Sequence, residues 1–335
     1  MAGDAGESPR PGEHEALARL RQLLPAAPEG EVWSGDDAAV VRAGPGGPLL
    51  LLATDTVVGD LDADLSLTTL SDLGWKAMAV NLSDIAAMGG TPAQAVVSVV
   101  GLGPDDLERL YEGIVAAANE YRCPVVGGDL SAGRQIVVTV AVTGTVDGPP
   151  VLRRGACPGD GIWVTGPLGA SAAGLRVLRA RGSPPALGPG ALAADRPNEP
   201  GRPNEEEKAL MAAHARPRPA LAAGTVARRA GATAMIDVSD GLLADVAQLT
   251  DQSGVGFELE EVPVAAGATG EEALVGGDEY VLAFTLAPRG AAAVRQAFAA
   301  SGLPGPWLIG RCVEGPSRHL LNGAPVQVRG WEHTF

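Results

Sequence analysis

Apolar residues recur along this chain with two periods, and the alternation between them predicts an α/β protein. Spacings of three and four residues predict helices, and short runs rich in Val, Ile and Leu predict strands. Helices are expected at 13–24, 71–88, 105–121, 167–181, 207–230 with a break at 216–219, 242–253 and 290–301. Strands are expected at 48–53, 95–102, 136–146, 161–166, 234–241, 257–264, within 273–282 after a glycine turn, at 308–312 and at 326–329.

The length of 335 residues and the 46 % apolar content are enough for two domains of ordinary size. A polar, Pro/Gly-rich stretch near 147–159 predicts the boundary between them. This gives an N-terminal domain at 13–147 and a C-terminal domain at 148–335. Residues 1–12 are expected to form a disordered tail, and 182–206, rich in Pro, Gly and Asn, a mobile insertion.

One carboxylate, Asp84, lies inside the apolar helix-forming stretch that ends at Gly89-Gly90. A buried carboxylate without a partner is very costly, so Asp84 requires one. Other aspartates recur in similar polar settings along the chain. The hypothesis is that they converge with Asp84 on divalent cations that hold a nucleotide polyphosphate, and the alternative is a core aspartate satisfied by hydrogen bonds. The other members of the set are Asp37, Asp55, Asp129, Asp237 and Asp240.

The sequence around each of these aspartates gives a different strength of evidence for a metal site. Glycine turns at 35–37 and 127–129 place a carboxylate where a hard cation could be bound, but Gly and Asp are also common in ordinary turns. Thr54-Asp55 follows the apolar strand at 48–53. The segment 236–241 is more specific, because Asp237, Ser239 and Asp240 come directly after an apolar strand. Helix capping by Asp240 would explain only one of these three polar residues.

Composition excludes several classes of function. The net charge of −15, from 25 basic and 40 acidic residues, argues against a nucleic-acid surface. The three cysteines are far apart and lack CxxC spacing, which disfavours a zinc site or disulfides and favours a reducing cytoplasmic compartment. No apolar run reaches the ~18 residues of a membrane span, and no signal peptide is visible. A P-loop, a dinucleotide fingerprint, an HExxH motif and a GxSxG motif are absent.

Taken in order along the chain, several motifs together resemble the thiamine-monophosphate kinase family, in the superfamily of aminoimidazole ribonucleotide synthetase. The most specific are the runs from Lys76 to Gly89 and from Ile236 to Leu242. The others are Gly-Asp-Asp-Ala-Ala-Val-Val (35–41), Thr-Asp-Thr (54–56), Gly-Gly-Asp (127–129), Arg-Gly-Ala (154–156), Pro-Gly-Asp (158–160), Val-Thr-Gly (164–166), Gly-Gly-Asp-Glu-Tyr (276–280) and Gly-Trp-Glu-His (330–333). Together these motifs cover nearly the whole chain.

The resemblance implies a two-domain α/β (α+β) fold, an ATP-dependent phosphotransferase that makes thiamine diphosphate from thiamine monophosphate, and several Mg²⁺ ions. It implies a homodimer whose N-terminal sheets pair, a nucleotide in the cleft between the domains, and no covalent intermediate or general base. The metal ligands it implies are Asp37, Thr54, Asp55, Asp84, Asp129, Asp237 and Asp240. The ATP contacts it implies are Tyr111, Gly128, Asp129, Arg154 and Ser239, and the acceptor contacts are Asp62, Asp278 and Trp331.

The chain departs from the family pattern on the acceptor side. The family has a His-Phe pair shortly after Thr-Asp, and the segment 57–64 has neither residue. The family's Gly-Gly-Glu-Asp-Tyr is Gly-Gly-Asp-Glu-Tyr here, which leaves a side chain one methylene shorter at Asp278. Three hypotheses therefore stand: a thiamine-monophosphate kinase with a divergent acceptor pocket, the same phosphotransfer on another small acceptor, or a non-catalytic paralogue that binds a nucleotide or a partner.

Overall fold

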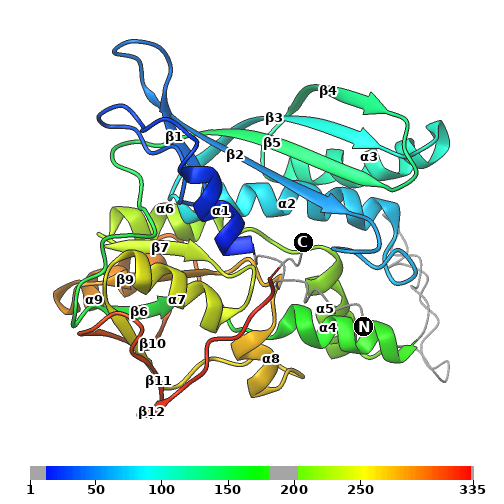
Figure 1. Ribbon diagram of the computed structural model, residues 1–335. Helices are drawn as coiled ribbons and strands as arrows, with labels where there is room; N and C mark the ends of the chain where they lie inside the picture. The colour runs from blue at the N-terminus through cyan, green and yellow to red at the C-terminus, as the bar shows by residue number, and fades with distance from the viewer. Residues whose placement is uncertain (1–12, 182–202, 333–335) are drawn as a thin grey trace, which may run out of the picture.

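Two mixed β-sheets, one in each half of the chain, organise the structure (Figure 1). The computed structural model describes residues 13–181 and 203–332. The first sheet has the strand order β1-β2-β5-β3-β4, and only its β3–β4 pair is parallel. Its strands are β1 (Ala39–Arg42), β2 (Leu49–Val58), β3 (Thr91–Val100), β4 (Val125–Ser131) and β5 (Val137–Thr145).

The second sheet has the order β12-β11-β8-β10-β6-β9-β7, and only its β11–β8 pair is parallel. Its strands are β6 (Gly161–Val164), β7 (Ala234–Asp237), β8 (Gly256–Leu259), β9 (Leu282–Leu286), β10 (Trp307–Val313), β11 (His319–Leu321) and β12 (Ala324–Pro325). The mixed α/β architecture expected from the hydrophobic pattern is confirmed, and no helix in the described ranges is long and apolar enough to cross a bilayer.

The helices fill the space between the two sheets and cover the outside of the second one (Figure 1). The helices of the first half are α1 (Glu13–Arg21), α2 (Leu70–Ala87) and α3 (Pro104–Glu120). Those of the second half are α4 (Ala170–Arg181), α5 (Glu205–Ala215), α6 (Leu221–Arg229), α7 (Leu242–Gln252), α8 (Gly270–Val275), the 3₁₀ turn η2 (Pro288–Gly290) and α9 (Ala291–Ala300).

Helix α2 is the central element, because it contacts the first sheet on one side and α6 and β7 of the second half on the other. A capping box starts it: the Thr69 hydroxyl accepts from the N–H of Asp72, and the Asp72 carboxylate accepts from the N–H of Thr69. Every residue from Ser71 to Ala87 is buried except Asp84, as expected for a helix enclosed by protein. Gly89, with φ of 66°, ends it.

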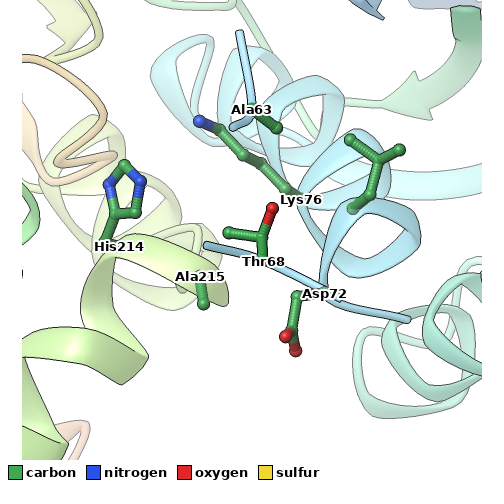
Figure 2. A pocket seen from close by; sticks show the side chains of 7 residues that line it. Ala63, Thr68, Asp72, Lys76, His214 and Ala215 are labelled. Atoms are coloured by element: carbon green, nitrogen blue, oxygen red, sulfur yellow. The ribbon is translucent and has the colours of Figure 1, made fainter. Parts of the chain in front are cut away.

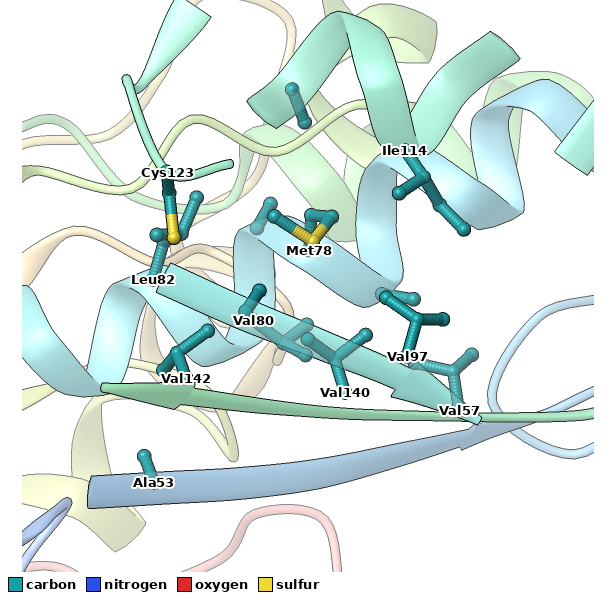
Figure 3. Close-up of a cluster of buried hydrophobic side chains, with 14 of the residues drawn as sticks. Ala53, Val57, Met78, Val80, Leu82, Val97, Ile114, Cys123, Val140 and Val142 are labelled. Atoms are coloured by element: carbon teal, nitrogen blue, oxygen red, sulfur yellow. The ribbon is translucent and has the colours of Figure 1, made fainter. Parts of the chain in front are cut away.

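The N-terminal core forms where α2 and α3 pack against the inner face of the first sheet (Figure 3). Met78 and Leu82 of α2 meet Val140 of β5 and Ile114 of α3, and all four side chains are fully buried. Helices α2 and α3 approach closely because Gly74 and Gly113 face the partner backbone. A Cβ on Gly113 would lie 1.7 Å from the carbonyl oxygen of Ser71.

Two segments expected to be strand ends or turns lie inside strands of the first sheet. Strand β2 continues to Val58, so Thr54 and Asp55 are inside it and not after it. Thr54 and Asp55 are part of the strand because β2 pairs with β5 continuously from Leu50 to Val58. The expected glycine turn at 127–129 is part of β4. Gly128 is required there because a Cβ would lie 1.8 Å from the carbonyl oxygen of Val97 in β3.

Several expectations for the second half were wrong. The strand expected at 234–241 ends at Asp237. No strand forms at 326–329, and the last described strands are the short pair β11 and β12. The strand expected at 257–264 ends at Leu259. The strand expected within 273–282 begins only at Leu282, as β9. Residues up to Val275 form the helix α8, because Thr269 and Glu272 form a capping box that starts it. The tail at 1–12 and most of the insertion at 182–206 lie outside the described residues, and α5 begins at Glu205.

Candidate functional site

Three carboxylates from distant parts of the chain meet beside α2. Asp37 comes from the loop before β1, Asp84 from α2, and Asp237 from the end of β7. One oxygen of each lies within 4.8 Å of the others. The sequence predicts that these three residues share one site, and the structure brings them together. Oxygen ligands at this spacing suit a hard divalent cation.

Burial and mutual repulsion make this cluster unfavourable as three bare anions. Burial, with the charges of Asp55, Asp237 and Asp37, raises the pKa of Asp84 well above its ordinary value. Burial and the charge of Asp37 raise the pKa of Asp237 to about 8, although the hydroxyl of Ser83 donates to it at 2.6 Å. The cluster therefore holds protons near neutral pH unless a cation replaces them.

Arg153 is the basic residue that contacts the cluster, and the sequence analysis did not identify it. Its guanidinium donates to Asp37 Oδ1 at 2.7 Å and to Gln248 Oε1 at 2.9 Å, and its backbone N–H donates to Asp36 Oδ1 at 2.6 Å. The neighbouring Arg154, expected to contact ATP, has an exposed side chain. Two adjacent arginines are indistinguishable in sequence, and only the chain path decides which one points inward.

Asp37 keeps one oxygen that no protein group satisfies. Its side chain is fully buried, and Oδ1 takes the Arg153 hydrogen bond. Its Oδ2 has no hydrogen-bond partner among the described residues. A buried acceptor left without a donor is rare and costly, so this oxygen fits a ligand that the protein itself does not supply.

Asp245 on α7 organises the loop that follows Asp237, and it too was missed. Its Oδ2 accepts the backbone N–H groups of Ser239, Asp240 and Gly241 at 3.0–3.1 Å. The residue that caps α7 is Gly241, so the alternative that Asp240 is the helix cap is wrong. The alternating polar residues of this segment could have suggested a loop held by hydrogen bonds, but the sequence does not indicate that Asp245 is the acceptor.

Asp55 lies near the cluster, whereas Thr54 points away from it. Asp55 pairs with the buried Val140, which puts its side chain on the face of the sheet that α2 covers. Its backbone N–H donates to Asn81 Oδ1 of α2 at 2.9 Å. The side chain of Thr54 is on the opposite face because side chains alternate along a strand, and its hydroxyl donates to the Val140 carbonyl oxygen.

The structure separates Asp129 from the carboxylate cluster within one chain. Asp129 pairs with Ser98 of β3, whose partner Thr139 in β5 faces the same side as Thr54. Asp129 is therefore exposed on the uncovered face of the sheet, together with the neighbouring Gly128 backbone. Tyr111 lies on α3 against the N-terminal core, where burial raises its pKa.

The expected acceptor residues lie at two places around the site. Asp62 is in the loop after β2, where its carboxylate accepts the N–H of Val58 at 2.8 Å. Asp278 is in the turn before β9, 2.7 Å from Lys76 Nζ. Trp331 is half exposed, and its backbone N–H donates to the carbonyl oxygen of Asp240, beside the carboxylate cluster.

Comparison with known proteins finds relatives that match both halves of the chain. The family model of AIR synthase related proteins matches with its N-terminal domain at 35–146 and its C-terminal domain at 158–320. The thiamine-monophosphate kinase of Mycobacterium tuberculosis is 36 % identical over 320 residues, covering 89 % of this chain and 84 % of that protein. The chain belongs to the thiamine-monophosphate kinase family.

Other members of the thiamine-monophosphate kinase family are similar over comparable lengths. The Bacillus subtilis enzyme is 32 % identical, covering 82 % of this chain and 83 % of that protein. A solved structure described as "AaThiL complexed with AMPPCP and TMP" is 30 % identical with a TM-score of 0.79, covering 96 % of this chain and 97 % of that one. The hydrogenase maturation protein HypE, at 18 % identity and a TM-score of 0.64, shares the fold alone.

Proposed function

We propose that this protein phosphorylates thiamine monophosphate to thiamine diphosphate, by direct in-line transfer of the ATP γ-phosphate. The observation that carries the proposal is the partly buried cluster of Asp37, Asp84 and Asp237, in a chain of the thiamine-monophosphate kinase family. The relative solved with AMPPCP and TMP supports a nucleotide and an acceptor bound together. The acidic cluster is the feature that such a reaction requires, because two phosphorylated reactants repel each other.

The cluster fits Mg²⁺. All its ligands are carboxylate oxygens, one of them is buried without a donor, and the pKa of Asp237 is raised to about 8 by burial and nearby charge. We assign Asp37, Asp84 and Asp237 as the residues that would hold the metal, with Asp55 and Asp240 beside them. Bound Mg²⁺ would supply positive charge that stabilises the transferring phosphoryl group.

The protein's own contribution is positioning. Helix α2 carries Asp84 in an enclosed, rigid setting, and Asp245 fixes the loop of Ser239 and Asp240 through three amides. Arg153 keeps one fixed positive charge at the cluster, against Asp37. In-line transfer between two phosphates needs aligned reactants and neutralised charge, and no side chain acts as a nucleophile or general base.

The acceptor would lie between the metal cluster and the segments of Asp62 and Asp278. Trp331 offers a flat aromatic surface next to Asp240, which suits stacking on a ring of the acceptor. The residues at 57–64 that replace the family's His-Phe pair leave this wall without an aromatic ring. The acceptor assay therefore includes other small phosphomonoesters besides thiamine monophosphate.

We also propose a homodimer in which the N-terminal sheets meet. Leu52 of β2 and Val96 of β3 are each 44 % exposed on the face of the sheet that the helices do not cover. An uncovered apolar sheet face is a common interaction surface. Asp129 is on this same face, so it would serve a metal or nucleotide only in a site that the second subunit presents. The free cysteines 123, 157 and 312 suit the cytoplasmic location expected from the sequence.

The deciding experiment measures product directly. Purified protein with ATP and Mg²⁺ is expected to convert thiamine monophosphate to thiamine diphosphate, followed by mass spectrometry and by coupled release of ADP. Asp84→Asn is expected to lose most of this activity, whereas Asp106→Asn, an exposed aspartate on α3, retains it. Tight Mg-ATP binding with no thiamine diphosphate formed would contradict the proposal, and turnover of another phosphomonoester would identify a different acceptor.

A further inference from the structure

Lys76 is a buried lysine that the metal cluster does not use. The chain has only two lysines among its 25 basic residues, and the other, Lys208, is on the surface of α5. Lys76 is 5 % exposed on α2. Burying an ammonium group is costly unless it is paired, so its partners identify its role.

The two partners of Lys76 come from the two segments proposed to contact the acceptor. Its Nζ donates to the carbonyl oxygen of Asp62 at 3.0 Å, in the loop after β2. It also donates to Asp278 Oδ2 at 2.7 Å, in the turn before β9. These segments are separated by more than 200 residues, and this ammonium group joins them.

The turn that carries Asp278 has a strained backbone. Asp278 and Tyr280 have φ values of 63° and 53°, which side chains other than glycine seldom adopt. The hydroxyl of Tyr280 donates to Asp278 Oδ1 at 2.9 Å, while Lys76 holds Oδ2. A strained backbone conformation persists only when the surrounding structure fixes it. The hydrogen bonds from Tyr280 and Lys76 hold the Asp278 carboxylate in one orientation.

Within the part of the chain that the structure describes, Lys76 is the basic side chain that forms an ion pair with Asp278. His214 and Lys76 line one narrow gap, together with Ala63, Thr68, Asp72 and Ala215 (Figure 2). Burial and the charge of Lys76 lower the pKa of His214 to about 4, so the ring is neutral near pH 7, and Ser171 Oγ is 3.0 Å from its Nδ1. Asp72, which also lines the gap, is paired with Arg216.

Lys76 and the metal cluster are on one rigid helix but at different points along it. Lys76 and Asp84 are eight positions apart, which corresponds to about 12 Å along an α-helix. Helix α2 therefore contributes to the metal cluster through Asp84 and to the acceptor segments through Lys76. A substitution of Lys76 is expected to disturb the acceptor segments and to leave the metal cluster in place.

We propose that Lys76 is the positioning residue of the acceptor site, which fixes Asp278 and the loop of Asp62 in the arrangement that binds the acceptor. The inference rests on the proposed function. An ammonium group suits this role better than a guanidinium, because it is compact and its three N–H donors are not confined to one plane.

The test separates the two substrates kinetically. Lys76→Met keeps the length of the side chain and removes its charge. The KM for thiamine monophosphate is expected to rise about tenfold or more, because charged hydrogen bonds to both segments are lost. The KM for ATP and the Mg²⁺ dependence are expected to stay within about twofold of the wild type. Lys208→Met, in the only other lysine, is the matched control and should change neither KM.

A double variant guards against a folding defect. Lys76→Met leaves Asp278 buried without its counter-ion, whereas Lys76→Met with Asp278→Asn removes both charges and should melt closer to the wild type. If Lys76 acts through Asp278, the double variant and Lys76→Met have the same KM for the acceptor. The fold-increase in KM of the double variant is then smaller than the product of the fold-increases of the two single variants.

Two results would overturn the inference, and they are distinguishable. An active wild type whose Lys76→Met variant keeps its acceptor KM, or raises both KM values equally, removes the role of Lys76 and leaves the proposed function intact. A wild type that forms no thiamine diphosphate removes the proposed function, and this inference falls with it.

Discussion

Asp237→Asn tests the electrostatics of the carboxylate cluster most directly. Burial and the charge of Asp37 raise the pKa of Asp237 from about 4 in the unfolded chain to about 8 in the native protein. Between these two values the native state holds a proton that the unfolded state has released, so the metal-free wild type loses stability as pH rises. Asparagine has nearly the same shape and carries no charge, which removes this dependence.

The size of the effect follows from the shift. For each pH unit between about 4 and 8, the free energy of unfolding of the wild type falls by about 1.4 kcal/mol relative to that of Asp237→Asn. The difference has an upper bound of about 5 kcal/mol at pH 8. In EDTA, the variant is therefore expected to be more stable than the wild type near pH 8, and the difference should fall toward zero near pH 4. Coupling to Asp84 spreads the titration over a wider pH range without changing its sign.

The assay is urea denaturation at pH 5, 6, 7 and 8, in EDTA and in Mg²⁺. Mg²⁺ should stabilise the wild type, because it binds the native cluster alone, and should stabilise Asp237→Asn much less. Activity of the variant should fall by more than the roughly 10- to 100-fold typical of outer-shell metal residues. A stability difference that does not change with pH would contradict the raised pKa of Asp237, and equal stabilisation of both proteins by Mg²⁺ would contradict metal binding at this cluster. Asp106→Asn is the exposed control.

Three further predictions concern the loop after β7, the packing of α2 on α3, and the proposed dimer. Asp245→Ala should lower kcat/KM by about 10- to 100-fold, because the amides of 239–241 lose their acceptor, and Asp245→Asn, which keeps an oxygen there, should lose less. Gly74→Ala should lower the free energy of unfolding in urea by about 1–3 kcal/mol, since its Cβ would lie 2.1 Å from a backbone carbonyl of α3, whereas Gly305→Ala meets no atom and should be neutral. Val96→Asp should turn the proposed dimer into a monomer in light scattering, because it places a charge on the uncovered sheet face; an unchanged mass would locate the interface elsewhere.

Local patterns identified most helices well. Helix α2 was predicted from its apolar run and glycine stop, and the break between α5 and α6 from Pro217 and Pro219. Predictions failed where tertiary contacts decide conformation. Gly127-Gly128-Asp129 reads as a turn, yet close approach to β3 makes it a strand, and the short helix α8 depends on a capping box in a segment that reads as loop.

Carboxylates placed among apolar residues can be recognised in the amino-acid sequence, and the cost of burying a charge indicates that each needs a partner. The order of motifs along the chain also indicated the family. Which carboxylates meet depends on the folded chain: Asp37, Asp84 and Asp237 converge, while Asp129 faces the other side of the sheet. Side-chain direction depends on strand register and chain path, which link distant segments. For the same reason, Arg153, Asp245 and Lys76 emerged only when their partners, far away in sequence, were placed beside them.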